Sequence, residues 1–148
     1  MSGYIVLAEN ITYKNNKLSC INIYDNISPI VLPSEFIFDI AILCGPDWKT
    51  GEHKLKIKAE ADNNKEIELG DFTVTIPDEN FVYNAYANNI KLPVDDSIKY
   101  INFKILEDDK VVISRKYMIS AMFIRQKVEA QATPEPKQPE KKKKKKDK

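Results

Sequence analysis

Residues 53–61 read HKLKIKAEA, and this stretch decides the fold class. From Leu55 onward the odd positions are apolar and the even positions are charged. Successive side chains of a β-strand point to opposite faces, so this period of two predicts a strand with one face buried and the other in water. The pattern continues over residues 67–76, but its parity changes across Gly70-Asp71, which predicts a β-bulge or a bend there.

The polar residues 62–64 (DNN) predict a β-hairpin turn between the two strands. If Ala59 and Ile67 lie opposite each other on the core side, these residues form a three-residue loop in which one asparagine takes a left-handed conformation. The same register places Lys58 opposite Glu68, whereas a slip by two would oppose two glutamates. We therefore prefer the first register, since a cross-strand charge pair contributes about 0.2–1 kcal/mol.

A second hairpin is predicted further along the chain. Ile101, Phe103 and Ile105 share one face, and Val111 and Ile113 share one face of the return strand. Residues 107–109 (EDD) form the loop between them. Odd parity continues to residue 123, which favours a long last strand over the competing interpretation, a short helix over residues 118–127.

Near-continuous apolar runs at residues 4–9, 18–24 and 35–44 predict central or sandwich-interior strands, and residues 81–92 predict another, interrupted by asparagines. Pro29, Pro33, Pro46, Pro77 and Pro93 fall between the runs. About eight short strands without a long amphipathic helix predict an all-β antiparallel fold, a sandwich or a barrel, of which we favour a two-sheet sandwich.

The chain of 148 residues divides into one domain, residues 1–130, and a tail, residues 131–148. The domain carries 15 lysines and arginines against 19 acids, a net charge of −4, whereas the tail carries 8 lysines against 3 acids, a net charge of +5. The tail is rich in proline and lysine and has no aromatic residue, so we expect it to be disordered.

The N-terminus has no charged leader before a long apolar run, and no stretch is long enough to span a bilayer, so we expect a cytoplasmic protein. Cys20 and Cys44 lie in apolar runs and are expected to be free thiols rather than a disulfide. Two cysteines with a single histidine do not suit a closed zinc site, and no cofactor motif is present.

We find no catalytic constellation. The single histidine, His53, starts a strand without a nucleophile in a suitable context, so we expect it to be a surface residue. Several aspartates fall in or near loops, where turn chemistry is a stronger explanation than calcium binding. They are Asp25, Asp47, Asp62, Asp71, Asp78, Asp95, Asp96, Asp108 and Asp109.

Three features could form a binding surface. Lys54, Lys56 and Lys58 make a basic stripe, which we interpret as a solvated sheet face because Glu66 and Glu68 share it. Trp48 lies in the loop at residues 45–51 and is the best single candidate for a binding surface, with capping of the core as the favoured alternative. Tyr83, Tyr86 and Tyr100 could join it in an aromatic platform for sugar or single-stranded nucleic acid.

The tail contains an unbroken block of six lysines, which attracts phosphates without sequence preference and could also hold the protein loosely at an anionic membrane. A solubilising tail without a dedicated partner is the equal alternative. The block is Lys141, Lys142, Lys143, Lys144, Lys145 and Lys146.

Several short signatures together resemble a family of small bacterial proteins catalogued as a domain of unknown function. They are Ala8-Glu9-Asn10, Leu18-Ser19, the run from Ile23 to Ile27, Gly51-Glu52-His53, Leu92-Pro93, and the hairpin from Phe103 through Asp108-Asp109 to Val111. The resemblance covers residues 4–120 and implies an immunoglobulin-like sandwich. It supplies no activity and no site residues, and hairpins of that family often carry Asp-Gly where this chain has Asp108-Asp109.

The sequence therefore predicts a non-enzymatic β-sandwich that acts as a binding or accessory module for a protein partner or a polyanion, with non-specific attraction to nucleic acid through its tail. One alternative is a structural or assembly subunit, phage-derived or similar, that associates through sheet edges. The other is an enzyme or calcium-binding module that uses loop carboxylates.

Overall fold

The computed structural model describes residues 1–124 except residues 16, 30, 79–82 and 122. The predicted disordered tail, residues 131–148, lies outside the described residues. Within them the fold is all-β, without a helix. The strands are β1 (Gly3–Lys14), β2 (Lys17–Ile23), β3 (Val31–Leu32), β4 (Ser34–Cys44), β5 (Gly51–Ala61), β6 (Glu66–Ile76), β7 (Asn84–Val94), β8 (Tyr100–Glu107), β9 (Lys110–Met118) and β10 (Phe123–Ile124).

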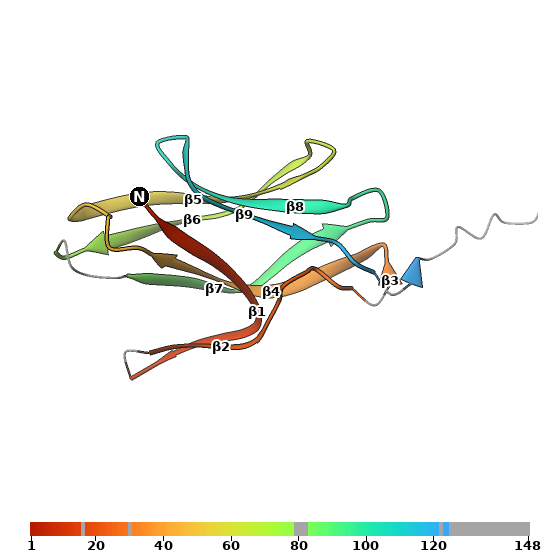
Figure 1. Cartoon of the computed structure of the whole chain (residues 1–148), viewed down its shortest axis with the longest axis horizontal. Coiled ribbons are helices and arrows are strands. Elements are labelled where there is room, and N and C mark those ends of the chain that lie inside the picture. Colours follow the sequence, from red (N-terminus) through yellow and green to blue (C-terminus); the bar gives the residue numbers. More distant parts are fainter. Residues whose placement is uncertain (16, 30, 79–82, 122, 125–148) are drawn as a thin grey trace, which may run out of the picture.

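Eight of these strands form two antiparallel four-stranded sheets that pack on each other (Figure 1). The first sheet has the order β2-β1-β4-β7, and the second has the order β6-β5-β8-β9. The two-residue strands β3 and β10 pair in parallel. Without β2, the order β1-β4-β7 over β6-β5-β8-β9 is the immunoglobulin-like arrangement of strands A-B-E over C′-C-F-G. The predicted sandwich is confirmed.

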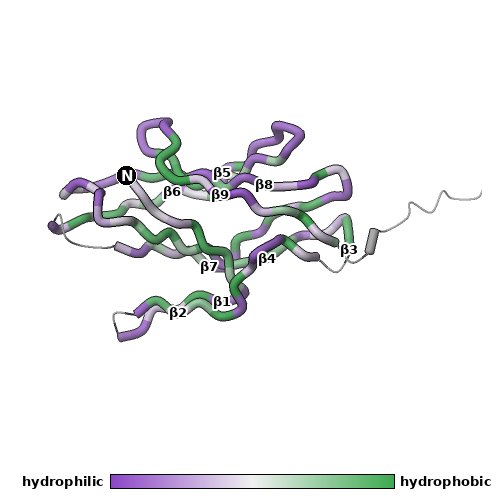
Figure 2. Tube along the Cα trace, in the orientation of Figure 1, coloured by the Kyte–Doolittle hydropathy of each residue, from purple (hydrophilic) through white to green (hydrophobic). Residues whose placement is uncertain are grey.

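Alternate side chains from both sheets fill one continuous core. Phe38 of β4 and Phe103 of β8 meet across it edge to face, with ring centroids 5.6 Å apart. Burial of one such side chain contributes about 1.5–3 kcal/mol to folding. Polar residues gather in the turns instead. Figure 2 shows that the loops that join β5 to β6 and β8 to β9 are hydrophilic.

The first hairpin has the predicted register. Ala59 pairs with Ile67 and Lys58 with Glu68, and Asn64 takes the left-handed conformation with a φ of 62°. The predicted bulge is also present: Ile57 pairs with Gly70, so Leu69 is the extra residue of β6.

The second hairpin differs from its prediction by one residue. Ile105 pairs with Ile113 but Leu106 pairs with Val111, so Val112 is an extra residue in β9. This bulge turns Val111 to the outside, where it is 51% exposed, and not to the face of Ile113 as predicted. The connection is a two-residue turn, Asp108-Asp109, shorter than the predicted three-residue loop.

The end of the last strand and one proline also differ from prediction. β9 ends at Met118, and the alternative helix is absent from the described part of residues 118–127. Pro93 lies inside β7 rather than between strands. It is tolerated there because β7 is an edge strand, so one side of its backbone needs no ladder partner.

The β1–β2 hairpin bends away from the sandwich and lies below β7 in Figure 1. Asn22 has a left-handed φ of 53° at the bend, and its side-chain amide donates a hydrogen bond to Glu9. Beyond the bend, Ile11 packs with Ala8 and Ala41 in a second small cluster on the outer face of the first sheet. The hairpin thus covers part of a sheet face that would otherwise expose apolar residues.

Candidate functional site

A hollow lies between the edge strands β6 and β7. It is a groove of about 180 Å³. Ile42 of β4 and Ile57 of β5 contribute to its lining from the middle of the two sheets. We call this space the β6–β7 groove. Its remaining lining residues are Leu69, Gly70, Asp71, Phe72, Ala85, Tyr86, Ala87 and Ile90.

The groove exists because small residues stand where larger ones would fill the core. Ala85 and Ala87 of β7 point toward the core, and Gly70 of β6 has no side chain at the bulge. The apolar walls formed by Leu69 and Phe72 consequently remain half-buried. The groove is an apolar surface that the chain's described residues leave partly open to solvent.

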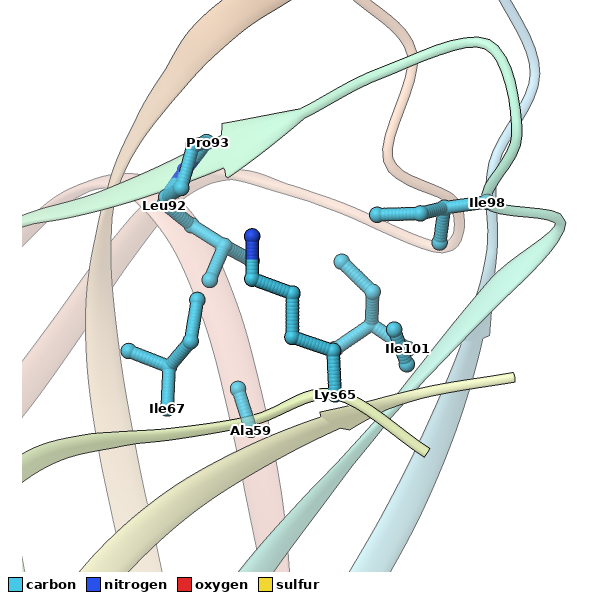
Figure 3. A pocket seen from close by; sticks show the side chains of 8 residues that line it. Ala59, Lys65, Ile67, Leu92, Pro93, Ile98 and Ile101 are labelled. Atoms are coloured by element: carbon cyan, nitrogen blue, oxygen red, sulfur yellow. The ribbon is translucent and has the colours of Figure 1, made fainter. Parts of the chain in front are cut away.

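A second hollow lies on the same side of the sandwich, nearer the β5–β6 and β7–β8 loops. Its volume is about 10 Å³, close to the space that one water molecule needs. Figure 3 shows Ile67 and Leu92 facing each other across this hollow, with the side chain of Lys65 extending over it. Of these two hollows, the β6–β7 groove is the one with room for more than a single water molecule.

A buried carboxylate joins three strands of the first sheet. Asp39 of β4 is 4% exposed and lies opposite a bulge at Asn88-Asn89. It accepts hydrogen bonds from the Asn88 side chain (2.6 Å), the Asn89 backbone N–H (2.8 Å) and the Ile11 backbone N–H (2.7 Å). Asp39 thus joins β1, β4 and β7. Its signal in the sequence is a single acid inside an apolar run.

His53 is 8% exposed, so the prediction of a surface histidine is wrong. Its Nδ1 lies 2.6 Å from Glu107 Oε1 and its Nε2 lies 2.8 Å from the carbonyl oxygen of Lys49. Burial lowers its pKa, but the hydrogen bonds to Lys49 and Glu107 and the charge of Glu107 outweigh burial, so the pKa of His53 is raised above its ordinary value. The strand-start position could not show that the β4–β5 loop folds over the ring.

Trp48 belongs to the core and not to an exposed surface. The residue is 2% exposed, its Nε1 donates a hydrogen bond to the carbonyl oxygen of Ser2 (2.7 Å), and its ring meets that of His53 edge to face. The indole therefore caps the core, the alternative that the sequence analysis favoured. Its ring is unavailable as a stacking platform.

The three candidate tyrosines have different surroundings. Tyr86 is exposed on β7, where its ring stacks with that of Tyr13. Tyr100 lies under the ammonium group of Lys116, which is 4.2 Å from the ring centroid. Tyr83 is half-buried against the core. Of these, Tyr86 is the one that borders the β6–β7 groove.

The lysine stripe of β5 is a solvated sheet face, as interpreted. Lys58 pairs with Glu66 at 2.7 Å, and Lys54 and Lys56 approach Glu52 and Asp109 at 4.0 Å. The neighbouring acids neutralise the stripe, so it lacks the excess positive charge of a nucleic-acid surface.

Asp71 lies in β6, contrary to its prediction as a loop residue, because the strand continues through the bulge, while the other candidate aspartates lie outside the strands. Asp95 accepts hydrogen bonds from the backbone and side chain of Ser97, and Asp62 accepts one from the backbone of Lys99. Among the residues that the structure describes, no three His, Cys, Asp or Glu side chains gather as metal ligands would. The lysine block at residues 141–146 lies outside the described residues.

Both cysteines are free, as predicted. Cys44 lies in the core, where burial raises the pKa of its thiol to about 11, while Cys20 of β2 is half-buried against the second small cluster. A thiol with a raised pKa is a poor nucleophile at neutral pH, so Cys44 has a packing role.

In the described part of the chain, no helix is long and apolar enough to cross a membrane. A scan against known protein families finds no match, and a search of curated proteins finds no relative of this chain.

Proposed function

We propose that this chain is a non-enzymatic binding module whose binding site is the β6–β7 groove. The observation that carries the proposal is an apolar space of about 180 Å³ that opens at a sheet edge. Cofactor and drug-sized sites occupy roughly 300–1,000 Å³, whereas an apolar cavity of roughly 150 Å³ holds a single benzene ring. The groove therefore suits one aromatic or branched aliphatic group.

The walls support this proposal energetically. Leu69 and Phe72 are half-buried, and a ligand group that covers them removes apolar surface from water. Complete burial of a phenylalanine or leucine side chain contributes about 1.5–3 kcal/mol, which by itself gives weak binding. Tight binding would need further contacts outside the groove.

The test is a titration of the isotopically labelled protein with benzyl alcohol, followed by amide chemical shifts. We expect saturable shifts at residues 69–72 and 85–90. The substitution Ala87→Leu, which fills the groove, should abolish them, and Ser114→Leu, on the exposed face of β9, should leave them unchanged. Shifts that are absent from the groove, or that persist in Ala87→Leu, would contradict the proposal.

A second proposal concerns the tail. The six lysines at residues 141–146 follow a domain with a net charge of −4, so attraction to polyanions would come from the tail alone.

The two free thiols support a reducing compartment, and we propose that the protein resides in the cytoplasm.

A further inference from the structure

We propose that His53 is a pH-sensitive latch on the β4–β5 loop, residues 45–50: its protonated ring holds the loop closed over Trp48, and loss of one ring proton releases Lys49 and exposes the indole. This inference does not depend on the β6–β7 groove. It is carried by the two acceptors that face the ring, by the position of Trp48 and by the glycine at which the loop joins β5.

The ring of His53 is held between two acceptors from separate parts of the fold. Its Nδ1 faces Glu107 Oε1 at the end of β8, at 2.6 Å, and its Nε2 faces the carbonyl oxygen of Lys49 in the loop, at 2.8 Å. A neutral imidazole has one N–H and one lone pair, so it can donate to one of these acceptors but not to both. After loss of a proton, one nitrogen turns its lone pair toward an acceptor oxygen, and this contact is repulsive.

The contact with Lys49 is the one that breaks. A hydrogen bond to a carboxylate is stronger than one to a neutral carbonyl, so the remaining proton stays on Nδ1, opposite Glu107. His53 belongs to β5, which pairs with a strand on each side, whereas Lys49 belongs to a loop. The loop, and not the ring, is therefore the part that moves.

Movement of Lys49 acts directly on Trp48, the preceding residue. The indole is buried and meets the imidazole edge to face, with ring centroids 5.1 Å apart. The loop joins β5 at Gly51, whose φ of 132° is readily available to glycine, and element ends of this kind serve as hinges. Gly45 and Trp48 also donate hydrogen bonds to the carbonyl oxygen of Ser2, which do not involve the imidazole. The release therefore loosens the β5 end of the loop and does not unfold the domain.

The other charged groups around the ring lie on elements that the latch does not move. Glu52 and Lys54 flank His53 along β5 but point to the outer face of the sheet, where they approach each other at 4.0 Å. Val74 of β6, which pairs with His53, is uncharged. The exposed residues 108–110 follow Glu107 in the turn to β9. These positions leave Glu107 as the charge that holds the ring proton.

One group inside the loop has a similar titration range. Asp47 pairs with the amino group of Met1 at 3.1 Å. An α-amino group ordinarily titrates at about 7.7–8.0, so its deprotonation could also loosen the loop at mildly alkaline pH. The experiment must separate this group from His53.

Ring-nitrogen chemical shifts test the latch without any variant, because the chain has one histidine and one tryptophan. The pKa of His53 is raised, so the isotopically labelled full-length protein is titrated from about pH 5 to pH 9. We expect the neutral ring to carry its proton on Nδ1, and acrylamide to quench Trp48 fluorescence more strongly above the midpoint of the ring titration. A neutral ring with its proton on Nε2 would keep the bond to Lys49 and overturn the inference, as would quenching that does not change with pH.

Two isosteric variants identify the group responsible. In Glu107→Gln the new amide can donate to Nδ1, so a neutral ring with its proton on Nε2 satisfies both neighbours. We expect this variant to stay closed, with weak quenching over the whole titration. Asp47→Asn removes the charge that faces the Met1 amino group but no contact of the imidazole, and it should keep the transition. Persistence of the transition in Glu107→Gln, or its loss in Asp47→Asn, would rule out His53 as the latch.

Discussion

His53 at the start of β5 and Glu107 at the end of β8 are joined by a 2.6 Å hydrogen bond beneath the β4–β5 loop. The other ring nitrogen of His53 faces the carbonyl oxygen of Lys49 at 2.8 Å. Both partners are acceptors, so both hydrogen bonds form together only when the imidazole carries two protons. The geometry thus favours the imidazolium, in agreement with the raised pKa.

This pair predicts a pH dependence of stability. The pKa of His53 is higher in the folded protein than in the unfolded chain, so its contribution is complete below the unfolded pKa of about 6.5 and is lost as pH rises through the folded pKa. We expect the free energy of unfolding in urea to fall from pH 6 upward. Glu107→Gln should remove this slope, and Glu52→Gln, at an exposed position, should preserve it. An unchanged slope in Glu107→Gln would contradict the assignment.

Asp39 predicts a large loss of stability on substitution. Asp39→Ala leaves the backbone N–H groups of Ile11 and Asn89 without their partner, at a cost of about 1–3 kcal/mol for each buried donor that stays unsatisfied. We expect the urea midpoint to fall accordingly. Asp96→Asn, an exposed control, should change stability by less than about 0.5 kcal/mol. If Asp39→Ala lowered the free energy of unfolding as little as Asp96→Asn, the role of Asp39 would be contradicted.

The second hairpin predicts a stabilising substitution. Asp108 and Asp109 have φ values of 49° and 61°, the pattern of a type I′ turn, which glycine tolerates better than aspartate. Asp109→Gly should raise the free energy of unfolding by about 0.5–1 kcal/mol. Thermal unfolding would measure this. Asp62→Gly, in the other hairpin, serves as the comparison: it removes a side chain that accepts a hydrogen bond from Lys99 and should not stabilise. Equal gains in both would point to a cause other than turn geometry.

The tail predicts salt-dependent binding to nucleic acid. If all six lysines at residues 141–146 contact phosphates of duplex DNA, the logarithm of the binding constant should fall with the logarithm of salt concentration with a slope near about −5. Fluorescence titration of labelled duplex DNA across salt concentrations would give the slope. A version that ends at Ala130 should bind negligibly, and equal binding by both versions would exclude the tail as the cause.

The hairpins could be predicted because local patterns determine them. The alternation around Ala59 and Ile67 fixes the register of the first hairpin, and the parity change at Gly70 marks its bulge. The second bulge, at Val112, escaped prediction because three consecutive apolar residues, 111–113, do not show which one is extra.

The candidate site was less predictable because it depends on contacts between distant segments. His53 is buried by the β4–β5 loop and by Glu107, which is 54 residues away. The groove depends on Ala85 and Ala87 facing the Gly70 bulge, and small residues in a strand give no signal until the two sheets are placed together. The sequence left Trp48 ambiguous because a loop tryptophan can point toward the core or toward solvent. In the structure Trp48 is buried and donates a hydrogen bond to Ser2.

The two long sides of the sandwich differ in the interactions that join one sheet to the other. On one side, Arg115 and Tyr117 of β9 donate hydrogen bonds to the carbonyl oxygen of Ile5 in β1, which joins the two sheets directly. On the other side, apolar residues of β6 and β7 line a hollow between the sheets. Local opening should begin there, since regions with fewer contacts unfold at lower free energy. Amide hydrogens of β6 and β7 would then exchange with deuterium well before those of β8.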